Sequence, residues 1–164
     1  MAAPNPPRCA ARRLGTRPPD GATVRGLSLA TLSVSMKESL KILAVEDETA
    51  VAQLLALVLC GPSCRVTTAC NGAQALEKIA AASQPFDVII TDHQMPEVTG
   101  LELVRELRAH HFGGKIAVLS AHLNEKNVHA YEDLSVDLML SKPFDVDELR
   151  HAIEVLSSED SIAA

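Results

Sequence analysis

Five residues with charged or nucleophilic side chains come directly after short apolar runs of the sequence: Glu46, Asp47, Asp92, Ser120 and Lys142. Two carboxylates about 4 Å apart repel each other by roughly 4 kcal/mol at an effective dielectric constant of about 20, so clustered acids need a counter-charge. Oxygen ligands with room for water suit Mg²⁺. A carboxylate beside Mg²⁺ and opposite a lysine can attack phosphorus and form an acyl phosphate, because the two cations neutralise charge on the phosphoryl oxygens.

Short continuous apolar runs alternate with stretches of helical period from Lys41 onward. The predicted strands are 42–45, 65–69, 88–91, 116–119 and 138–140. A helical pattern follows each strand, at about 100–110 for the third helix and about 125–134 for the fourth. In the other three helices the residues predicted to face the core are Val51, Leu54, Leu55, Val58 and Leu59; Leu76, Ile79 and Ala80; and Val146, Leu149, Ile153 and Leu156.

Five strand–helix units in succession predict an α/β fold, a doubly wound parallel sheet with helices on both faces. Continuous apolar strands are typical of parallel sheets that are covered on both sides, and right-handed crossovers place helices on each side. The periodicity does not reveal the strand order. The carboxyl ends of parallel strands nevertheless share one edge, where such sheets bind ligands, so we expect the five residues to converge there.

The charge of the chain is unevenly distributed and bears on its partners. The net charge is −6, from 15 Lys and Arg against 21 Asp and Glu. Residues 1–35 contain five Arg and one Asp, which leaves 10 basic and 20 acidic residues, or −10, in residues 36–164. An acidic body argues against DNA as a direct ligand, and no apolar run approaches the roughly 20 residues of a membrane span. We expect a cytoplasmic protein with no direct DNA binding and no membrane contact.

The four cysteines, Cys9, Cys60, Cys64 and Cys70, form no CxxC pair. Nothing in their spacing indicates a secreted disulfide framework. We interpret Cys60, Cys64 and Cys70 as small buried hydrophobic residues in a reducing compartment.

The first 36 residues are predicted to form a disordered N-terminal tail ahead of a domain at residues 37–160. Five prolines in residues 1–35 break any helix, and apolar residues show no period until the end of that stretch. Three interpretations are open. The start is misassigned and Met36 is the true initiator; the stretch is an Arg-rich, acid-poor transit peptide; or it is a genuine tail that contacts an anionic partner.

Four motifs of the chain resemble the receiver domains of two-component response regulators. They are ILAVEDE at 42–48, DVIITDHQMPEVTG at 87–100, Leu119-Ser120-Ala121, and Lys142-Pro143-Phe144. Each motif alone is weak, but four in the right order at predicted strand ends are a specific signal, and the resemblance covers residues 41–157. It implies a flavodoxin-like (βα)5 sandwich and a phosphoprotein that works in a phosphorelay.

The resemblance also implies the role of each site residue. Asp92 would be the phospho-acceptor, with Ser120 as the hydroxyl that moves to meet the phosphate and Lys142 as the phosphate-binding cation. Glu46, Asp47 and Asp92, with the backbone carbonyl of Gln94, would bind Mg²⁺. The Lys142–Pro143 bond would be cis, which X–Pro bonds rarely are. The phosphoryl donor would be a sensor histidine kinase or a histidine phosphotransfer protein.

Phosphorylation would then switch protein–protein interactions. It adds negative charge and strong acceptor oxygens, and the surface formed by the fourth helix, fifth strand and fifth helix would repack. Too few residues follow the fifth helix for an output domain, so we expect another protein to bind this surface. Receivers commonly carry an aromatic residue three positions before the lysine, where Met139 stands here, and Gly-Ala where Ser135-Val136 stand. We expect Tyr131 on the output surface with Val128.

Two alternative functions are open. One is an interaction module of the same fold that is never phosphorylated. The other is a Mg²⁺-dependent phosphohydrolase with Asp92 as nucleophile, which would need a general acid and a substrate cap; Gln94 stands where a second catalytic Asp would lie, and no cap insertion is present. We therefore predict no turnover of external substrate, only uptake of a phosphoryl group and self-dephosphorylation. His93 and His122 lack ligand spacing and are interpreted as non-ligands.

Overall fold

The computed structural model describes residues 39–159, so the predicted tail at 1–36 lies outside the described residues. Strands and helices alternate along the described chain. The strands are β1 (Leu40–Val45), β2 (Cys64–Ala69), β3 (Val88–Asp92), β4 (Lys115–Ser120) and β5 (Leu138–Ser141). The helices are α1 (Thr49–Leu59), α2 (Gly72–Ala81), α3 (Gly100–Ala109), α4 (Glu125–Glu132) and α5 (Val146–Glu159). The predicted elements are confirmed, with boundaries shifted by one or two residues.

The five strands form one parallel sheet in the order β2-β1-β3-β4-β5. The chain moves from β1 outward to β2, returns across β1 to β3, and then continues in the opposite direction. The strand order therefore reverses beside β1 and β3, which is the switch point where doubly wound sheets bind ligands. The predicted doubly wound (βα)5 fold is confirmed.

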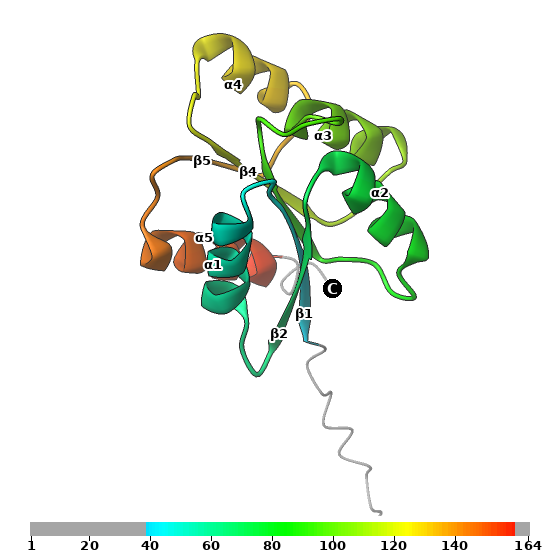
Figure 1. The fold of residues 1–164 in the computed structure, drawn as a ribbon, viewed down its shortest axis with the longest axis vertical. Coiled ribbons are helices and arrows are strands. Elements are labelled where there is room, and N and C mark those ends of the chain that lie inside the picture. Colours follow the sequence, from blue (N-terminus) through cyan, green and yellow to red (C-terminus); the bar gives the residue numbers. More distant parts are fainter. Residues whose placement is uncertain (1–38, 160–164) are drawn as a thin grey trace, which may run out of the picture. The chain divides into compact units, whose positions relative to one another are not determined.

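The helices cover both faces of the sheet (Figure 1). Leu55, Leu59, Leu149 and Ile153 of α1 and α5 pack with one set of strand side chains. Leu103, Val104, Leu107 and Tyr131 of α3 and α4, with Ala75 of α2, pack with the other set. Because alternate strand residues point into these two cores, β1, β3 and β4 are apolar along almost their whole length.

Two details of the predicted helix faces are wrong. Leu54 is 41% exposed, whereas Ala52, Leu55 and Leu59 of α1 are buried. In α2, Ala75 is buried and Ala80 is exposed. The pattern of apolar residues alone misplaced both, because a small alanine takes a buried position in each helix, Ala52 in α1 and Ala75 in α2.

The prediction that three cysteines are buried is also wrong. Cys60 and Cys70 are exposed and Cys64 is half-buried. Cys60 terminates α1 and Cys70 lies in the loop between β2 and α2, so both belong to connections that run over the surface. All three are free thiols.

Gly100 lets the start of α3 lie directly against the end of β3. A Cβ atom at this position would lie far inside van der Waals contact with the carbonyl oxygen of Asp92, and within 3.1 Å of Cα of His93. The amide of Gly100 also donates to the carbonyl oxygen of His93 at 3.1 Å. The close approach therefore braces the backbone on both sides of the Asp92–His93 bond.

Replacing Gly100 by Ala is expected to destabilise the chain by about 3 kcal/mol, because the clash is with backbone atoms that cannot rotate away. Gly113→Ala is the matched control, since a Cβ there meets nothing within 4 Å. Urea unfolding followed by circular dichroism measures both variants. Equal midpoints for the two would show that the approach of α3 to β3 is not tight.

Candidate acidic site at the carboxyl edge of the sheet

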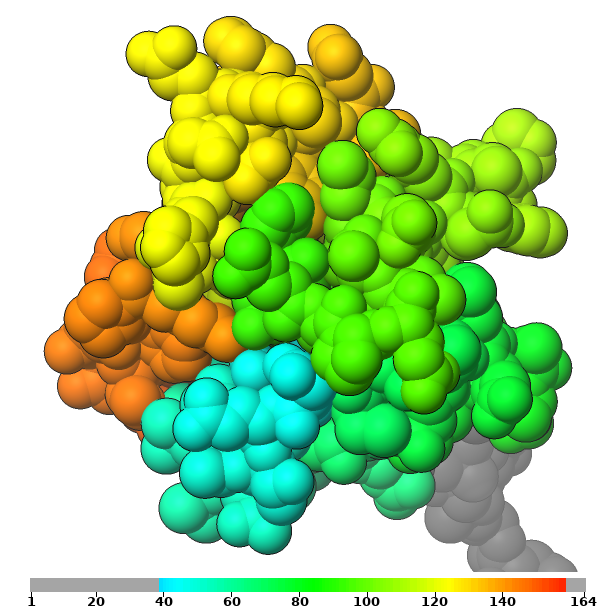
Figure 2. Space-filling view, turned by 45° about the horizontal axis from the view of Figure 1, so that its top comes forward, coloured from blue at the N-terminus to red at the C-terminus, as the bar shows by residue number. Residues whose placement is uncertain are grey.

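The segments that follow β1, β3, β4 and β5 meet at one edge of the sheet. Figure 2 looks toward this edge, where the cyan, green, yellow and orange segments of the chain surround a common point. Glu46 and Asp47 follow β1, Asp92 is the last residue of β3, and Ser120 is the last residue of β4. Lys142 follows β5. The predicted convergence of the five residues is confirmed.

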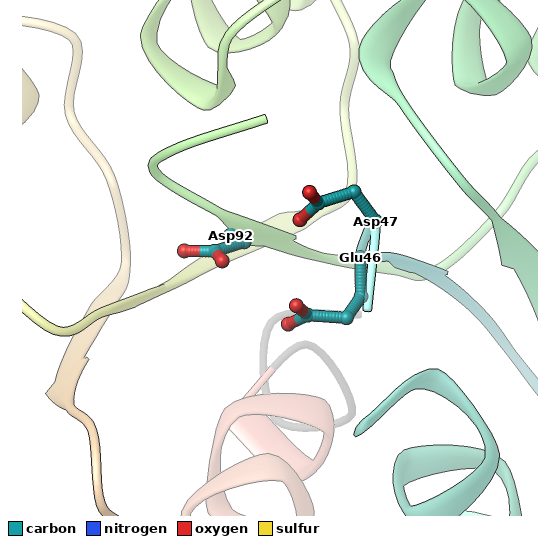
Figure 3. Close-up of side chains that lie close together, drawn as sticks. All are labelled: Glu46, Asp47 and Asp92. Carbon is teal, nitrogen blue, oxygen red and sulfur yellow. The ribbon is translucent and has the colours of Figure 1, made fainter. Parts of the chain in front are cut away.

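Three carboxylates form the acidic part of the site (Figure 3). Oxygen atoms of Glu46, Asp47 and Asp92 all lie within 4.8 Å of one another. Glu46 is 2% exposed and Asp92 is 9% exposed, whereas Asp47 is open to solvent. The arrangement places two buried carboxylates beneath a third at the surface.

Lys142 places one ammonium group between the two buried carboxylates. Its Nζ donates to Oε2 of Glu46 at 2.7 Å and to Oδ2 of Asp92 at 2.8 Å. The amide of Lys142 also donates to the carbonyl oxygen of Ser120 at 2.8 Å, which holds the loop after β5 against β4. The Lys142–Pro143 peptide bond is cis, as the family resemblance implied. A double ion pair with three poorly exposed partners needs this geometry to offset the loss of hydration.

Burial and charge oppose each other in the electrostatics of the site. Burial raises the pKa of Glu46 above its ordinary value, and the hydrogen bond from Lys142 only partly offsets that effect. Burial by itself would lower the pKa of Lys142, but its hydrogen bonds to Asp92 and Glu46 outweigh burial and raise that pKa. Lys142 therefore stays a cation, and its single ammonium group lies in a site with three carboxyl groups.

The backbone around Asp92 makes hydrogen bonds to β4 and to the Asp92 carboxylate. The amide of His93 donates to the carbonyl oxygen of Leu119 at 3.0 Å, and the amide of Gln94 lies 3.4 Å from Oδ1 of Asp92. Gln94 stands two residues beyond Asp92, with its amide facing the Asp92 carboxylate. Its proposed role as a carbonyl ligand stays a prediction.

Ser120 is buried beside Asp92, since Asp92 and Leu119 are register partners on β3 and β4. Its Oγ accepts a hydrogen bond from the amide of His122 at 3.1 Å. The hydroxyl is therefore engaged with its own loop, and reaching a group on Asp92 would require it to turn away from that amide.

The two histidines near the site, His93 and His122, are not part of its carboxylate cluster. Within residues 39–159, the cluster able to hold a metal ion contains Glu46, Asp47 and Asp92 and no histidine. Both ring nitrogens of His93 face elsewhere, toward Oη of Tyr131 at 2.7 Å and Nδ2 of Asn127 at 3.0 Å.

The expectation that Tyr131 lies on the output surface is wrong. Its side chain is fully buried, with its ring edge-on to that of His93 at a centroid distance of 5.6 Å. Burial, and secondarily the charge of Asp92, raises the pKa of Tyr131, so the hydroxyl stays protonated. A sequence signal was available: α4 reads EKNVHAYE, and its one large apolar residue is the one that must face the sheet.

The fold and site together define a class of protein, a doubly wound α/β domain with an acidic, lysine-bearing site at its switch point. The chain belongs to the response regulator receiver domain family, whose family model matches residues 42–154. Over 116 residues it is 40% identical to the Staphylococcus aureus transcriptional regulatory protein KdpE. The matched region covers 71% of this chain and 49% of KdpE. The chain thus spans about half the length of this curated relative.

Solved structures agree with the family assignment. The receiver domain of Francisella response regulator 1452 is 28% identical, with a TM-score of 0.67 over 74% of this chain and 99% of that domain. The Vibrio cholerae chemotaxis protein CheY4 is 29% identical, with a TM-score of 0.66 over 72% of this chain and 98% of that protein. This chain is a receiver domain of the two-component type. In the part that the structure describes, no helix is long and apolar enough to cross a membrane.

Proposed function

We propose that this receiver takes a phosphoryl group onto Asp92 from a histidine kinase or a histidine phosphotransfer protein. The observation that carries the proposal is the bridge from Lys142 to both Asp92 and Glu46, beside the exposed carboxylate of Asp47. In the reaction a carboxylate oxygen of Asp92 forms a bond to phosphorus as the bond from phosphorus to the donor's histidine nitrogen breaks. The electron pair of that bond returns to the imidazole, and the product is an acyl phosphate.

The donor set at this edge fits Mg²⁺. Carboxylate oxygens of Glu46, Asp47 and Asp92 form this set, and the carbonyl of Gln94 would add a further oxygen. Mg²⁺ prefers oxygen ligands with water in the remaining positions. A bound Mg²⁺ would neutralise charge on the transferring phosphoryl group. The exposed carboxylate of Asp47 leaves the site open to solvent and to a donor protein.

Lys142 and Ser120 would hold the product. The ammonium of Lys142 already lies 2.8 Å from Oδ2 of Asp92, so a phosphoryl group there would come within reach of it. Ser120 would lose the hydrogen bond from the amide of His122, and its hydroxyl would donate a hydrogen bond to a phosphoryl oxygen. These movements, together with added charge of about −1.5 to −2, would favour a second packing of the surface formed by α4, β5 and α5, which a downstream protein would recognise.

The acyl phosphate would be removed by water, so the chain would return to its first state without a turnover reaction on external substrate. Gln94 and His122 stand two residues beyond Asp92 and Ser120, close enough to the site to influence the rate of that hydrolysis. A cytoplasmic location follows from the proposed partners, since histidine kinases present their phosphoryl groups there.

Incubation with acetyl phosphate and Mg²⁺, followed by intact mass measurement, tests the proposal. We expect the mass to rise by one phosphate, with loss of that phosphate in hydroxylamine and no uptake when Mg²⁺ is chelated. Continued hydrolysis of a small phosphoester, without stoichiometric labelling, would support a phosphohydrolase instead. No uptake and no turnover would support an interaction module.

Mg²⁺ is expected to stabilise the chain through Asp47. At a concentration of 100 times its dissociation constant, a ligand that binds only the folded state adds about 2.7 kcal/mol. The melting temperature should therefore rise with Mg²⁺ in the wild type and stay constant in Asp47→Asn. Glu48→Gln is the matched control, because Glu48 is the next acid along the chain and lies outside the cluster. A full Mg²⁺ effect in Asp47→Asn would remove Asp47 from the site.

A further inference from the structure

A continuous chain of hydrogen bonds runs from the site to the buried face of α4. The amide of His122 donates to Oγ of Ser120 at 3.1 Å, and the carbonyl oxygen of His122 accepts from Nδ2 of Asn127 at 3.3 Å. The same Nδ2 lies 3.0 Å from Nε2 of His93, and Nδ1 of His93 lies 2.7 Å from Oη of Tyr131. This series of hydrogen bonds thus begins at Ser120 and ends at Tyr131.

The chemistry of these groups gives the chain a direction. Nδ2 of Asn127 can only donate, so Nε2 of His93 must accept, and the neutral ring carries its proton on Nδ1. That proton is donated to the hydroxyl oxygen of Tyr131. The imidazole ring of His93, the residue directly after Asp92, therefore holds two residues of α4, Asn127 and Tyr131.

Met139 and Tyr131 differ in whether they can form a hydrogen bond toward the site. Met139 stands on β5 and packs, partly buried, against the core that contains Tyr131. A thioether has no proton to donate and is a weak acceptor, so Met139 cannot form a directional link to the site. Tyr131 can, and it is fully buried, with its hydroxyl held at 2.7 Å by His93.

We propose that Asn127, His93 and Tyr131 couple the position of Ser120 to that of α4. In the unmodified chain the four hydrogen bonds hold α4 against β3 and the loop after β4. When Ser120 turns toward a phosphoryl group on Asp92, the His122 amide loses its acceptor. The loop moves, the bonds of Asn127 to His122 and His93 are lost, and α4 is released. This coupling rests on the proposed phosphorylation of Asp92.

Three full-length variants and the wild type test the coupling by amide hydrogen exchange of peptides that span α4, with and without Mg²⁺ and beryllofluoride, a phosphoryl mimic. Tyr131→Phe keeps the buried ring and removes only the hydroxyl. Asn127→Ala removes the middle of the chain at a half-buried position. Lys126→Ala is the matched control, because Lys126 is an exposed neighbour on the same helix.

In the unmodified state, Tyr131→Phe and Asn127→Ala should each speed exchange in α4 about 5-fold, as expected when a buried hydrogen bond is lost. Lys126→Ala should match the wild type. The mimic should speed α4 exchange in the wild type and in Lys126→Ala, and the same increase should shrink at least about 2-fold in the other two variants. A merely structural role would lower protection in both states and leave the increase unchanged.

Two failures are distinguishable. If the wild type gains phosphate from acetyl phosphate but the increase in α4 exchange is undiminished in Tyr131→Phe and Asn127→Ala, the coupling is overturned and the proposed function stands. If the wild type takes up neither phosphate nor the mimic, the proposed function is overturned, and the coupling with it.

Discussion

Replacing Asp92 by Asn is expected to abolish the gain of one phosphate from acetyl phosphate. An amide oxygen carries no negative charge and is a poor nucleophile, so no acyl phosphate can form at this position. The substitution is nearly isosteric and keeps an oxygen acceptor for Nζ of Lys142, so the fold should survive it. Intact mass measurement of wild type and variant under the same conditions gives the result directly.

Asp133→Asn is the control for this experiment, because Asp133 is an exposed acid at the end of α4, away from the acidic cluster. It should gain one phosphate as the wild type does. If Asp92→Asn gains phosphate to the wild-type extent, another residue accepts the phosphoryl group and the assignment of Asp92 as the acceptor is wrong.

Replacing Lys142 by Met is expected to destabilise the metal-free chain by about 3 kcal/mol at neutral pH. Removing one partner of a poorly exposed ion pair leaves the other charges without compensation, and here two carboxylates lose the same partner. Glu46 and the side chain of Asp92 are only 2% and 12% exposed. Unfolding in urea with a chelator present measures the effect, since Mg²⁺ would supply the missing positive charge.

The pH dependence of this loss separates charge from packing. Burial already raises the pKa of Glu46 in the wild type, and removal of the ammonium should raise it further. A carboxyl whose pKa is higher in the folded state binds its proton more tightly there. Its ionisation therefore does not lower the free energy of unfolding below the unfolded-state pKa of about 4.3. The cost then grows as pH rises through the folded pKa.

The deficit of Lys142→Met should therefore be small at about pH 4 and complete by about pH 8. Lys126→Met, at an exposed position of α4, should show little deficit at either pH. A loss of equal size at both pH values would mean that packing of the lysine stem, rather than the ion pair, is responsible.

The strand ends were the best-predicted part of the site. Buried strands have a short, mostly apolar signature, and an acidic residue marks the end of two of them, Glu46 after β1 and Asp92 in β3. A parallel arrangement then forces these ends to one edge. The four motifs also indicated the receiver family, which the family match at 42–154 confirms. The roles of the individual residues stay predictions.

Side-chain environments were predicted less well where the local pattern was ambiguous. Tyr131 lies in a polar helix of eight residues with weak periodicity, so only the size of its side chain marked it as the residue that faces the sheet. Leu54 and Ala80 each lie close to the apolar side of a helix, where a small rotation exchanges exposed for buried positions. Cys60 and Cys70 stand at element ends, where composition says little about depth.

The amino-acid sequence by itself determined the number and order of the elements, the parallel α/β class and the residues that gather at the carboxyl edge. These follow from local periodicity and from the rule that parallel strands share one edge. Only the tertiary structure decided the strand order, the double ion pair of Lys142 and the hydrogen bonds from Ser120 to Tyr131. Those features depend on distances between residues up to 96 positions apart, which no pattern within one element can specify.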